Sequence, residues 1–161
     1  MSTSTSATLS GGNSRAFAAI GAAVLLAGAM DITAAFLTWA SRGITPVRIL
    51  QGIASAAIGP KSFDGGMATA ALGLAFHFLI AFSAATVFYF ASRKISFLLR
   101  QPILAGVLYG VAVYLVMYWI VVPLSLAHRG RFSIFNTVVA ILTHMVCVGL
   151  PISLMVRRFS R

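Results

Sequence analysis

The feature that most constrains this 161-residue chain is the spacing of its charged side chains. The charged residues fall in clusters that are separated by four long stretches. The only acidic or histidine residues within these stretches are Asp31, His77 and His144. Each stretch exceeds the roughly 20 apolar residues that a helix needs to cross a bilayer core of about 30 Å. A helix also satisfies its own backbone hydrogen bonds, which lipid cannot do.

We therefore expect an all-α, polytopic membrane protein with four transmembrane helices packed in a bundle. The predicted spans are 16–39, 68–91, 103–126 and 135–156. Charged residues make up only 9% of the chain, against about 25% in ordinary soluble domains. A soluble domain is thereby excluded, and the single cysteine allows no intrachain disulfide.

The segments that flank the transmembrane domain, 16–156, are short. Residues 1–15 are rich in Ser, Thr and Gly, which predicts a disordered N-terminal tail. Residues 157–161 form a basic C-terminal tail.

The basic residues predict an orientation. Seven of the 12 Lys and Arg residues lie in the N-terminal tail, second loop and C-terminal tail, and five lie in the first and third loops. By the positive-inside rule, this favours both termini in the cytoplasm. We expect the membrane to be a bacterial-type inner membrane. The net charge of +10 suits anionic lipid headgroups as partners. No motif supports binding to nucleic acid.

The first loop contains a predicted short amphipathic helix. Thr45 and Pro46 are a typical N-cap and first helical residue, and Gly59-Pro60 stops the pattern. Arg48, Gln51 and Ser55 form its predicted polar face. Such a helix is too short to span the membrane, so it either lies in the interface or re-enters the bilayer. It either braces the bundle or covers a site.

Small residues in the third predicted span indicate close helix packing. Gly106 and Gly110 form a GxxxG motif, which permits either a contact within the chain or a homodimer interface. Pro123 and Pro151 lie near the ends of the last two spans, where they are expected to kink or end the helices.

Titratable and phenolic side chains from all four spans are predicted to lie at one depth. Asp31 precedes the end of its span by eight residues, and His77 and His144 each follow the start of theirs by nine. The helical rise places all three roughly 12–14 Å from the same membrane face. Tyr118 lies at this level and Tyr114 one turn deeper. Polar side chains inside a membrane normally face the bundle interior or a wet cavity.

This polar layer leaves three hypotheses open. It could be a structural clasp in which Asp31 bonds to His or Tyr. It could hold haem b between His77 and His144 in an electron-transfer protein. It could exchange protons at Asp31, the only acid in any predicted span, in a proton-coupled small transporter.

Catalysis and metal binding have little support. The chain contains no HExxH, P-loop or GxGxxG motif, so we assign no catalytic residue and favour a protein that is not an enzyme. We assign no metal-ligating residues, and haem is the only cofactor considered.

Three stretches resemble a group of small bacterial four-helix integral membrane proteins with no assigned activity. They are residues 48–84 (RILQGIASAAIGPKSFDGGMATAALGLAFHFLIAFSA), the Asp31-Ile32 segment, and residues 106–125 (GVLYGVAVYLVMYWIVVPLS). The resemblance covers most of 28–155. It implies a four-helix membrane fold and no binding or catalytic residue.

Overall fold

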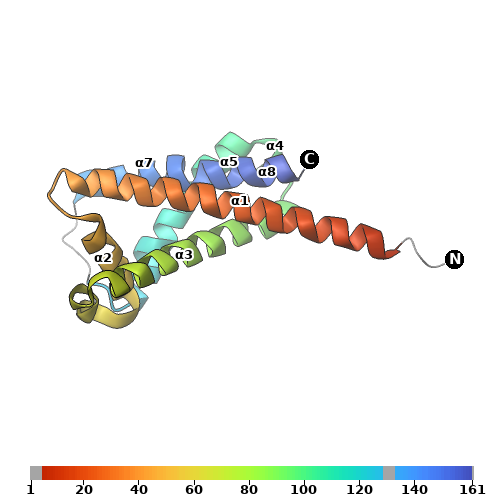
Figure 1. The fold of residues 1–161 in the computed structure, drawn as a ribbon. Coiled ribbons are helices and arrows are strands. Elements are labelled where there is room, and N and C mark those ends of the chain that lie inside the picture. The colour runs from red at the N-terminus through yellow and green to blue at the C-terminus, as the bar shows by residue number, and fades with distance from the viewer. Residues whose placement is uncertain (1–4, 129–132, 161) are drawn as a thin grey trace.

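The computed structural model describes residues 5–128 and 133–160, with side chains from Ser14 onward. Every regular element in these ranges is helical (Figure 1). In chain order the elements are α1 (Thr5–Ala40), α2 (Pro46–Ile58), the 3₁₀ helix η1 (Gly59–Asp64), α3 (Gly66–Lys94), α4 (Phe97–Arg100), α5 (Pro102–Val116), the π-helical turn η2 (Met117–Val121), α6 (Val122–Leu124), α7 (Ile134–Thr143), the π-helical turn η3 (His144–Gly149) and α8 (Leu150–Phe159).

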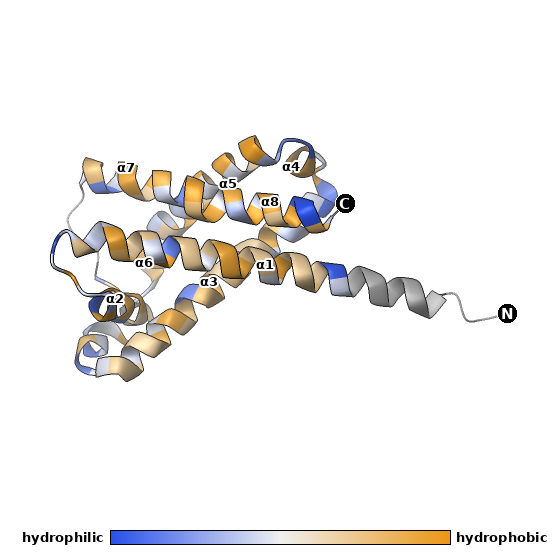
Figure 2. Ribbon diagram, turned by 45° about the horizontal axis from the view of Figure 1, so that its top comes forward, coloured by the Kyte–Doolittle hydropathy of each residue, from blue (hydrophilic) through white to orange (hydrophobic). Residues whose placement is uncertain are grey.

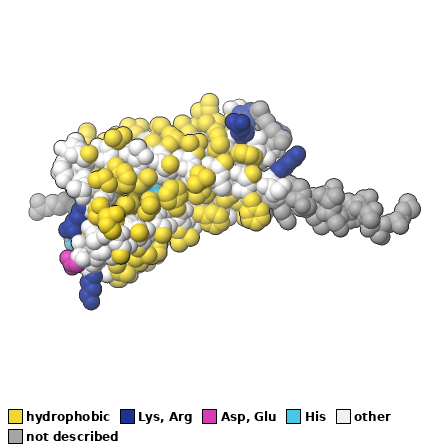
Figure 3. Space-filling model, in the orientation of Figure 1, with side chains coloured by type: hydrophobic (Ala, Val, Ile, Leu, Met, Phe, Trp, Pro, Cys, Tyr) yellow, Lys and Arg dark blue, Asp and Glu magenta, His cyan; other side chains and the backbone are white. Residues whose placement is uncertain are grey.

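Four of the described helical segments are long and apolar enough to cross a membrane. They are Ser14–Ala40, Gly66–Lys94, Pro102–Leu124 and Ile134–Phe159. The predicted spans are thus confirmed in number and place, by length and composition. Hydrophobic side chains cover the middle of the face in Figure 3, and Lys and Arg gather at its two ends. This pattern is the one expected of a multi-pass membrane protein.

The first helix extends further toward the N-terminus than the sequence predicted. We expected it to begin at residue 16, after a disordered tail, whereas α1 begins at Thr5. An α-helix that is already formed adds one hydrogen bond for each residue that joins it, so extending it is easier than starting it. The part of the predicted tail at residues 1–4 lies outside the described residues.

The spans pack most closely in the half of the molecule where α8 ends. There α1 contacts α3 and α8, and α5 contacts η3 and α8. Toward the other end α3 diverges from α8, and α2 packs along α3 (Figures 1 and 2). The buried core of the close-packed half is Ile20, Ala23, Ala27, Ala85, Phe88, Ala105, Val148, Ile152 and Val156.

Three glycines bring the third and fourth spans into backbone contact. A Cβ atom at Gly110 would collide with the backbone of His144 and Met145, and one at Gly149 with the backbone of Gly106. A Cβ at Gly106 would lie 2.9 Å from the Leu150 Cα. The GxxxG motif therefore serves packing within the chain. Of the two alternatives, a contact within the chain is the one this structure contains, and the fourth span occupies the surface at Gly106 and Gly110 that a homodimer would use.

Two prolines explain the π-helical turns. Proline has no backbone N–H, and its ring clashes with the carbonyl group four residues earlier in an α-helix. Those carbonyls belong to Trp119 for Pro123 and to Cys147 for Pro151, and both lie inside a π-helical turn. The third span ends one residue after Pro123, whereas the fourth continues through Pro151 to Phe159.

The helix predicted in the first loop is present as α2, between the expected start and stop. The Thr45 hydroxyl oxygen accepts from the Arg48 N–H at 3.3 Å, and Gly59 ends the helix with a φ of 67°. The helix rests directly on α3, because a Cβ at Gly73 would collide with the Leu50 carbonyl oxygen.

Two of the three residues on the predicted polar face of α2 are buried. Gln51 and Ser55 are buried, and only Arg48 is exposed. The Gln51 Nε2–H donates to the Gly66 carbonyl at 3.1 Å, and the Ser55 hydroxyl donates to the Gly52 carbonyl at 2.6 Å. Backbone carbonyls thus satisfy these side chains in place of solvent.

Candidate functional site

The three titratable side chains of the predicted layer line one cavity. This central cavity has a volume of about 210 Å³ and lies between α1, α2, α3 and the last two spans. Asp31, His77 and His144 are its titratable members. The remainder of its wall is formed by small and apolar residues: Ala27, Gly28, Ile53, Ile80, Ala81, Ala84, Val113, Met117 and Val148.

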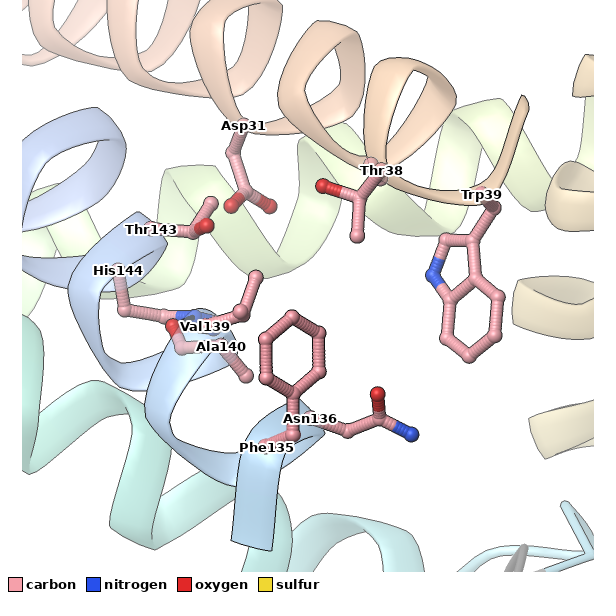
Figure 4. A pocket seen from close by; sticks show the side chains of 10 residues that line it. Asp31, Thr38, Trp39, Phe135, Asn136, Val139, Ala140, Thr143 and His144 are labelled. Atoms are coloured by element: carbon pink, nitrogen blue, oxygen red, sulfur yellow. Dashed lines mark hydrogen bonds between the residues drawn. The ribbon is translucent and has the colours of Figure 1, made fainter. Parts of the chain in front are cut away.

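A second cavity of about 180 Å³ shares Asp31 and His144 with the first. This side cavity lies between α1 and the fourth span and adds Thr38, Trp39, Asn136 and Thr143, with apolar Ala35, Phe135, Val139 and Ala140. Figure 4 shows the Asp31 carboxyl group pointing from α1 into this space, toward the fourth span. Asp31 is therefore accessible from both cavities.

The Asp31 carboxyl group has no hydrogen bond or ion pair to any residue in the described parts of the chain. His144 and Thr143 line the same space without bonding to it (Figure 4). The structural clasp between Asp31 and His or Tyr is thus absent among these residues. An acid within a span normally pairs with another group or faces water. Asp31 faces two cavities instead of pairing with another described residue.

Both histidines bond to backbone carbonyls. His77 Nε2 lies 2.9 Å from the Gly28 carbonyl oxygen, which ties α3 to α1, and its ring meets Phe78 edge-on at 5.5 Å. His144 Nδ1 lies 2.8 Å from the Ala140 carbonyl oxygen within its own helix. A carbonyl oxygen only accepts, so these two nitrogens carry the hydrogens. When neutral, His77 Nδ1 and His144 Nε2 keep free lone pairs.

The two tyrosines of the predicted layer lie beside His144 and line neither cavity. The Tyr114 ring meets the His144 ring nearly at a right angle, with centroids 5.6 Å apart, and stacks on Tyr118 at 5.7 Å. Tyr114 is buried. The layer thus consists of a cavity lined by Asp31, His77 and His144, with the Tyr114 ring packed against His144.

The loop-helix residues singled out in the sequence lie away from the cavities. Arg48 Nη1 donates to the Phe63 carbonyl at 3.4 Å, and its guanidinium stacks on the Phe63 ring at 4.0 Å. Instead, α2 contributes Ile53 to the central cavity. The helix therefore forms part of the cavity wall through an apolar side chain.

Four polar or aromatic residues of the side cavity were not predicted as site residues from the sequence: Thr38, Trp39, Asn136 and Thr143. A signal for Thr38 was available, because it follows Asp31 by seven residues and so lies on the same helical face. Thr143 directly precedes His144. Threonine is only weakly polar, so neither residue stands out among the apolar side chains of its span.

An arginine lies beside the side cavity, at the end of α1. The Arg42 Nη2 donates to the Asn136 Oδ1 at 2.6 Å, and its guanidinium lies 4.7 Å from the centre of the Trp39 ring. Trp39 and Asn136 both line the cavity. A fixed positive charge therefore lies beside the outer part of this space.

Comparisons with family models, curated proteins and solved structures gave no significant match. The resemblance to small bacterial membrane proteins therefore stays a prediction. Within residues 5–128 and 133–160, no group of three His, Cys, Asp or Glu side chains has the arrangement needed to hold a metal ion.

Proposed function

We propose that this membrane protein is a proton-coupled transporter of small cations, in which Asp31 exchanges a proton for the transported cation. The observation that carries the proposal is the Asp31 carboxyl group, which two cavities share and which bonds to no residue within 5–128 and 133–160. Placing a charged Asp at the centre of a spanning helix costs about 2.5–3.5 kcal/mol on insertion scales. A proton or a bound cation removes that net charge, so the two compete for one site.

The surroundings of Asp31 suit a small cation that forms hydrogen bonds. His144 on η3 lines the central cavity together with Asp31. On the α1 side, Thr38 supplies a hydroxyl group. The free lone pair of neutral His144 adds an acceptor for an N–H group.

The bis-histidine haem hypothesis receives less support from this geometry. Iron binds an imidazole nitrogen through its lone pair, and His77 already uses Nε2 to donate to Gly28. Only its Nδ1, the nitrogen nearer the backbone, remains. We expect protein purified with haem supplied during expression to show no Soret band that shifts on reduction. A band lost in both His77→Ala and His144→Ala would instead make haem ligation the leading function.

Exchange across a membrane tests the transport proposal. The protein is reconstituted into liposomes that contain a trapped pH indicator, and guanidinium is added outside. Guanidinium stays charged at every working pH, so it does not leak as a neutral base. We expect the lumen to become more alkaline as guanidinium enters and protons leave.

The chain offers a matched control, because its only two acidic residues are Asp31 and Asp64. Asp64 is exposed in the turn before α3. Asp31→Asn should abolish the alkalinisation, and Asp64→Asn should leave it unchanged. The proposal fails if the wild-type protein produces no alkalinisation, or if Asp31→Asn produces as much as the wild type.

A further inference from the structure

A large apolar groove runs beside the central cavity, where α3 diverges from the third span. It has a volume of about 610 Å³ and is bounded by α2, α3, η2 and α6. Its lining is almost entirely apolar and includes Ile49, Phe76, Leu79, Val121 and Leu124. Leu79 and Leu124 are 57% and 82% exposed on the spanning helices, which places the groove against lipid.

One end of the groove is closed by the chain itself. The Leu126 N–H donates to the Ala56 carbonyl at 2.9 Å, which joins the third loop to α2. At the other end, a second apolar cavity of about 360 Å³ between α3 and α5 shares Ile80, Met117 and Val121 with the groove. The apolar space therefore extends along the membrane-spanning part of α3, as an alkyl chain would require.

Three side chains separate this groove from the titratable groups. Ile53, Ile80 and Met117 line both the groove and the central cavity. Met117 is unbranched and adapts its shape readily, and it begins the π-helical turn η2. Rotation of these side chains would connect the lipid-facing groove to the cavity that contains Asp31.

Charge makes this route more favourable for a cation than the outer end of the side cavity. Arg42 lies there, bonded to Asn136 and stacked on Trp39, and it repels a cation that approaches along that path. Neither the groove lining nor the wall of Ile53, Ile80 and Met117 carries a charge.

From these observations we infer that the substrate is a single-chain cationic amphiphile that reaches the site from the bilayer. Its alkyl tail lies in the groove between α2, α3 and α6, and its small cationic head passes Met117 to pair with Asp31. The inference rests on the proposed role of Asp31 as a cation site and adds the chemical class of the substrate and its path.

Photochemical labelling in lipid nanodiscs tests this inference. The probe is an alkylguanidinium with a diazirine at the end of its tail, and mass spectrometry identifies the labelled residues. We expect labels on groove residues such as Leu79 and Val122 and few on Leu25 or Leu37, which are 67% and 71% exposed on α1. Excess guanidinium should suppress the groove labels, because it competes for the head site.

Two variants separate specific labelling from general contact with lipid. Asp31→Asn should reduce the groove labels about 30-fold or more, the loss that follows removal of one partner of a desolvated charge pair. Asp31→Glu keeps the carboxylate and should restore them, whereas Asp64→Asn should not change them. Equal labelling of α1 and the groove, unaffected by Asp31→Asn, would overturn the inference.

The two proposals fail in distinguishable ways. If guanidinium exchange in liposomes depends on Asp31 but the probe labels Phe135 in the side cavity instead of the groove, the cation site stands and the lipid route is wrong. If the groove is labelled but neither guanidinium nor Asp31→Asn changes the pattern, the tail binds without the head site and the inference is wrong. Absence of exchange, whatever the labelling, counts against the proposed function.

Discussion

At the scale of single residues, backbone contacts separate the structural glycines from the others. Gly110 lies where a Cβ would collide with the backbone of His144 and Met145, whereas a Cβ at Gly21 would meet nothing within 4 Å. Backbone atoms of a packed helix cannot move aside as a flexible side chain does. The consequence extends to the candidate site, because the contact at Gly110 fixes His144.

We predict that Gly110→Ala lowers the stability of the protein in mild detergent by about 1–3 kcal/mol, the usual cost of overpacking. Gly21→Ala should not destabilise the protein, because a Cβ at this position of α1 meets nothing within 4 Å and alanine favours a helix. Thermal unfolding, monitored by size-exclusion chromatography, measures the stability of both variants. Equal stability of the two variants would contradict the close contact between the third and fourth spans.

His77 has a structural contribution that can be measured separately from proton exchange. Its Nε2–H bond to Gly28 ties α3 to α1, and hydrogen bonds between spanning helices contribute about 0.6 kcal/mol on average. We predict that His77→Phe lowers unfolding stability by about this amount and preserves guanidinium-driven alkalinisation. Loss of exchange without loss of stability would assign His77 to the proton path instead.

At the scale of elements, the sequence predicts where helices lie better than which face they bury. Long stretches with few or no charged residues predicted the four spans, because length and hydropathy decide whether a helix can cross a bilayer. The ends of α2 followed from Thr45, Pro46 and Gly59. The burial of Gln51 could not be predicted, because its carbonyl partner at Gly66 is a contact between segments that no local pattern encodes.

The attachment of α2 to α3 depends on Gly73. We predict that Gly73→Ala forces α2 away from α3, because the new Cβ would collide with the backbone at Leu50. Hydrogen exchange at the α2 amides should then accelerate. Gly52→Ala is the matched control, since a Cβ at Gly52 meets nothing within 4 Å and the helix gains an alanine. Unchanged exchange in Gly73→Ala would contradict this packing.

At the scale of the whole molecule, both ends of the described chain lie at the same end of the structure (Figure 1). From the distribution of basic residues we predict that this end faces the cytoplasm. Ser41 and Ser96 are exposed in the loops at opposite ends and carry no charge. They are therefore suitable positions for measuring the orientation without changing the charge distribution that sets it.

We predict that an impermeant maleimide labels Ser41→Cys in right-side-out membrane vesicles and labels Ser96→Cys only after the membrane is opened. Both variants are made with Cys147→Ser, which removes the single native cysteine. The reverse labelling pattern would show that the termini face outward.

The candidate site could be predicted in part from equal depth along the spans. Asp31, His77 and His144 share a predicted depth, and the structure places them around one cavity. The absence of a partner for the Asp31 carboxyl group within 5–128 and 133–160 could not be predicted, because it depends on side-chain directions. Nor could the lipid-facing groove be predicted, because it arises from the divergence of α3 and from proline-associated π-helical turns.

Infrared difference spectroscopy can detect directly whether Asp31 exchanges a proton for a cation. The spectrum of the membrane-reconstituted protein is recorded before and after guanidinium is added. We predict that the C=O band of a protonated carboxylic acid is lost when guanidinium is added. This loss should not occur in Asp31→Asn and should occur in Asp64→Asn as in the wild type. A spectrum without that band loss, or the same loss in Asp31→Asn, would contradict the proposed exchange.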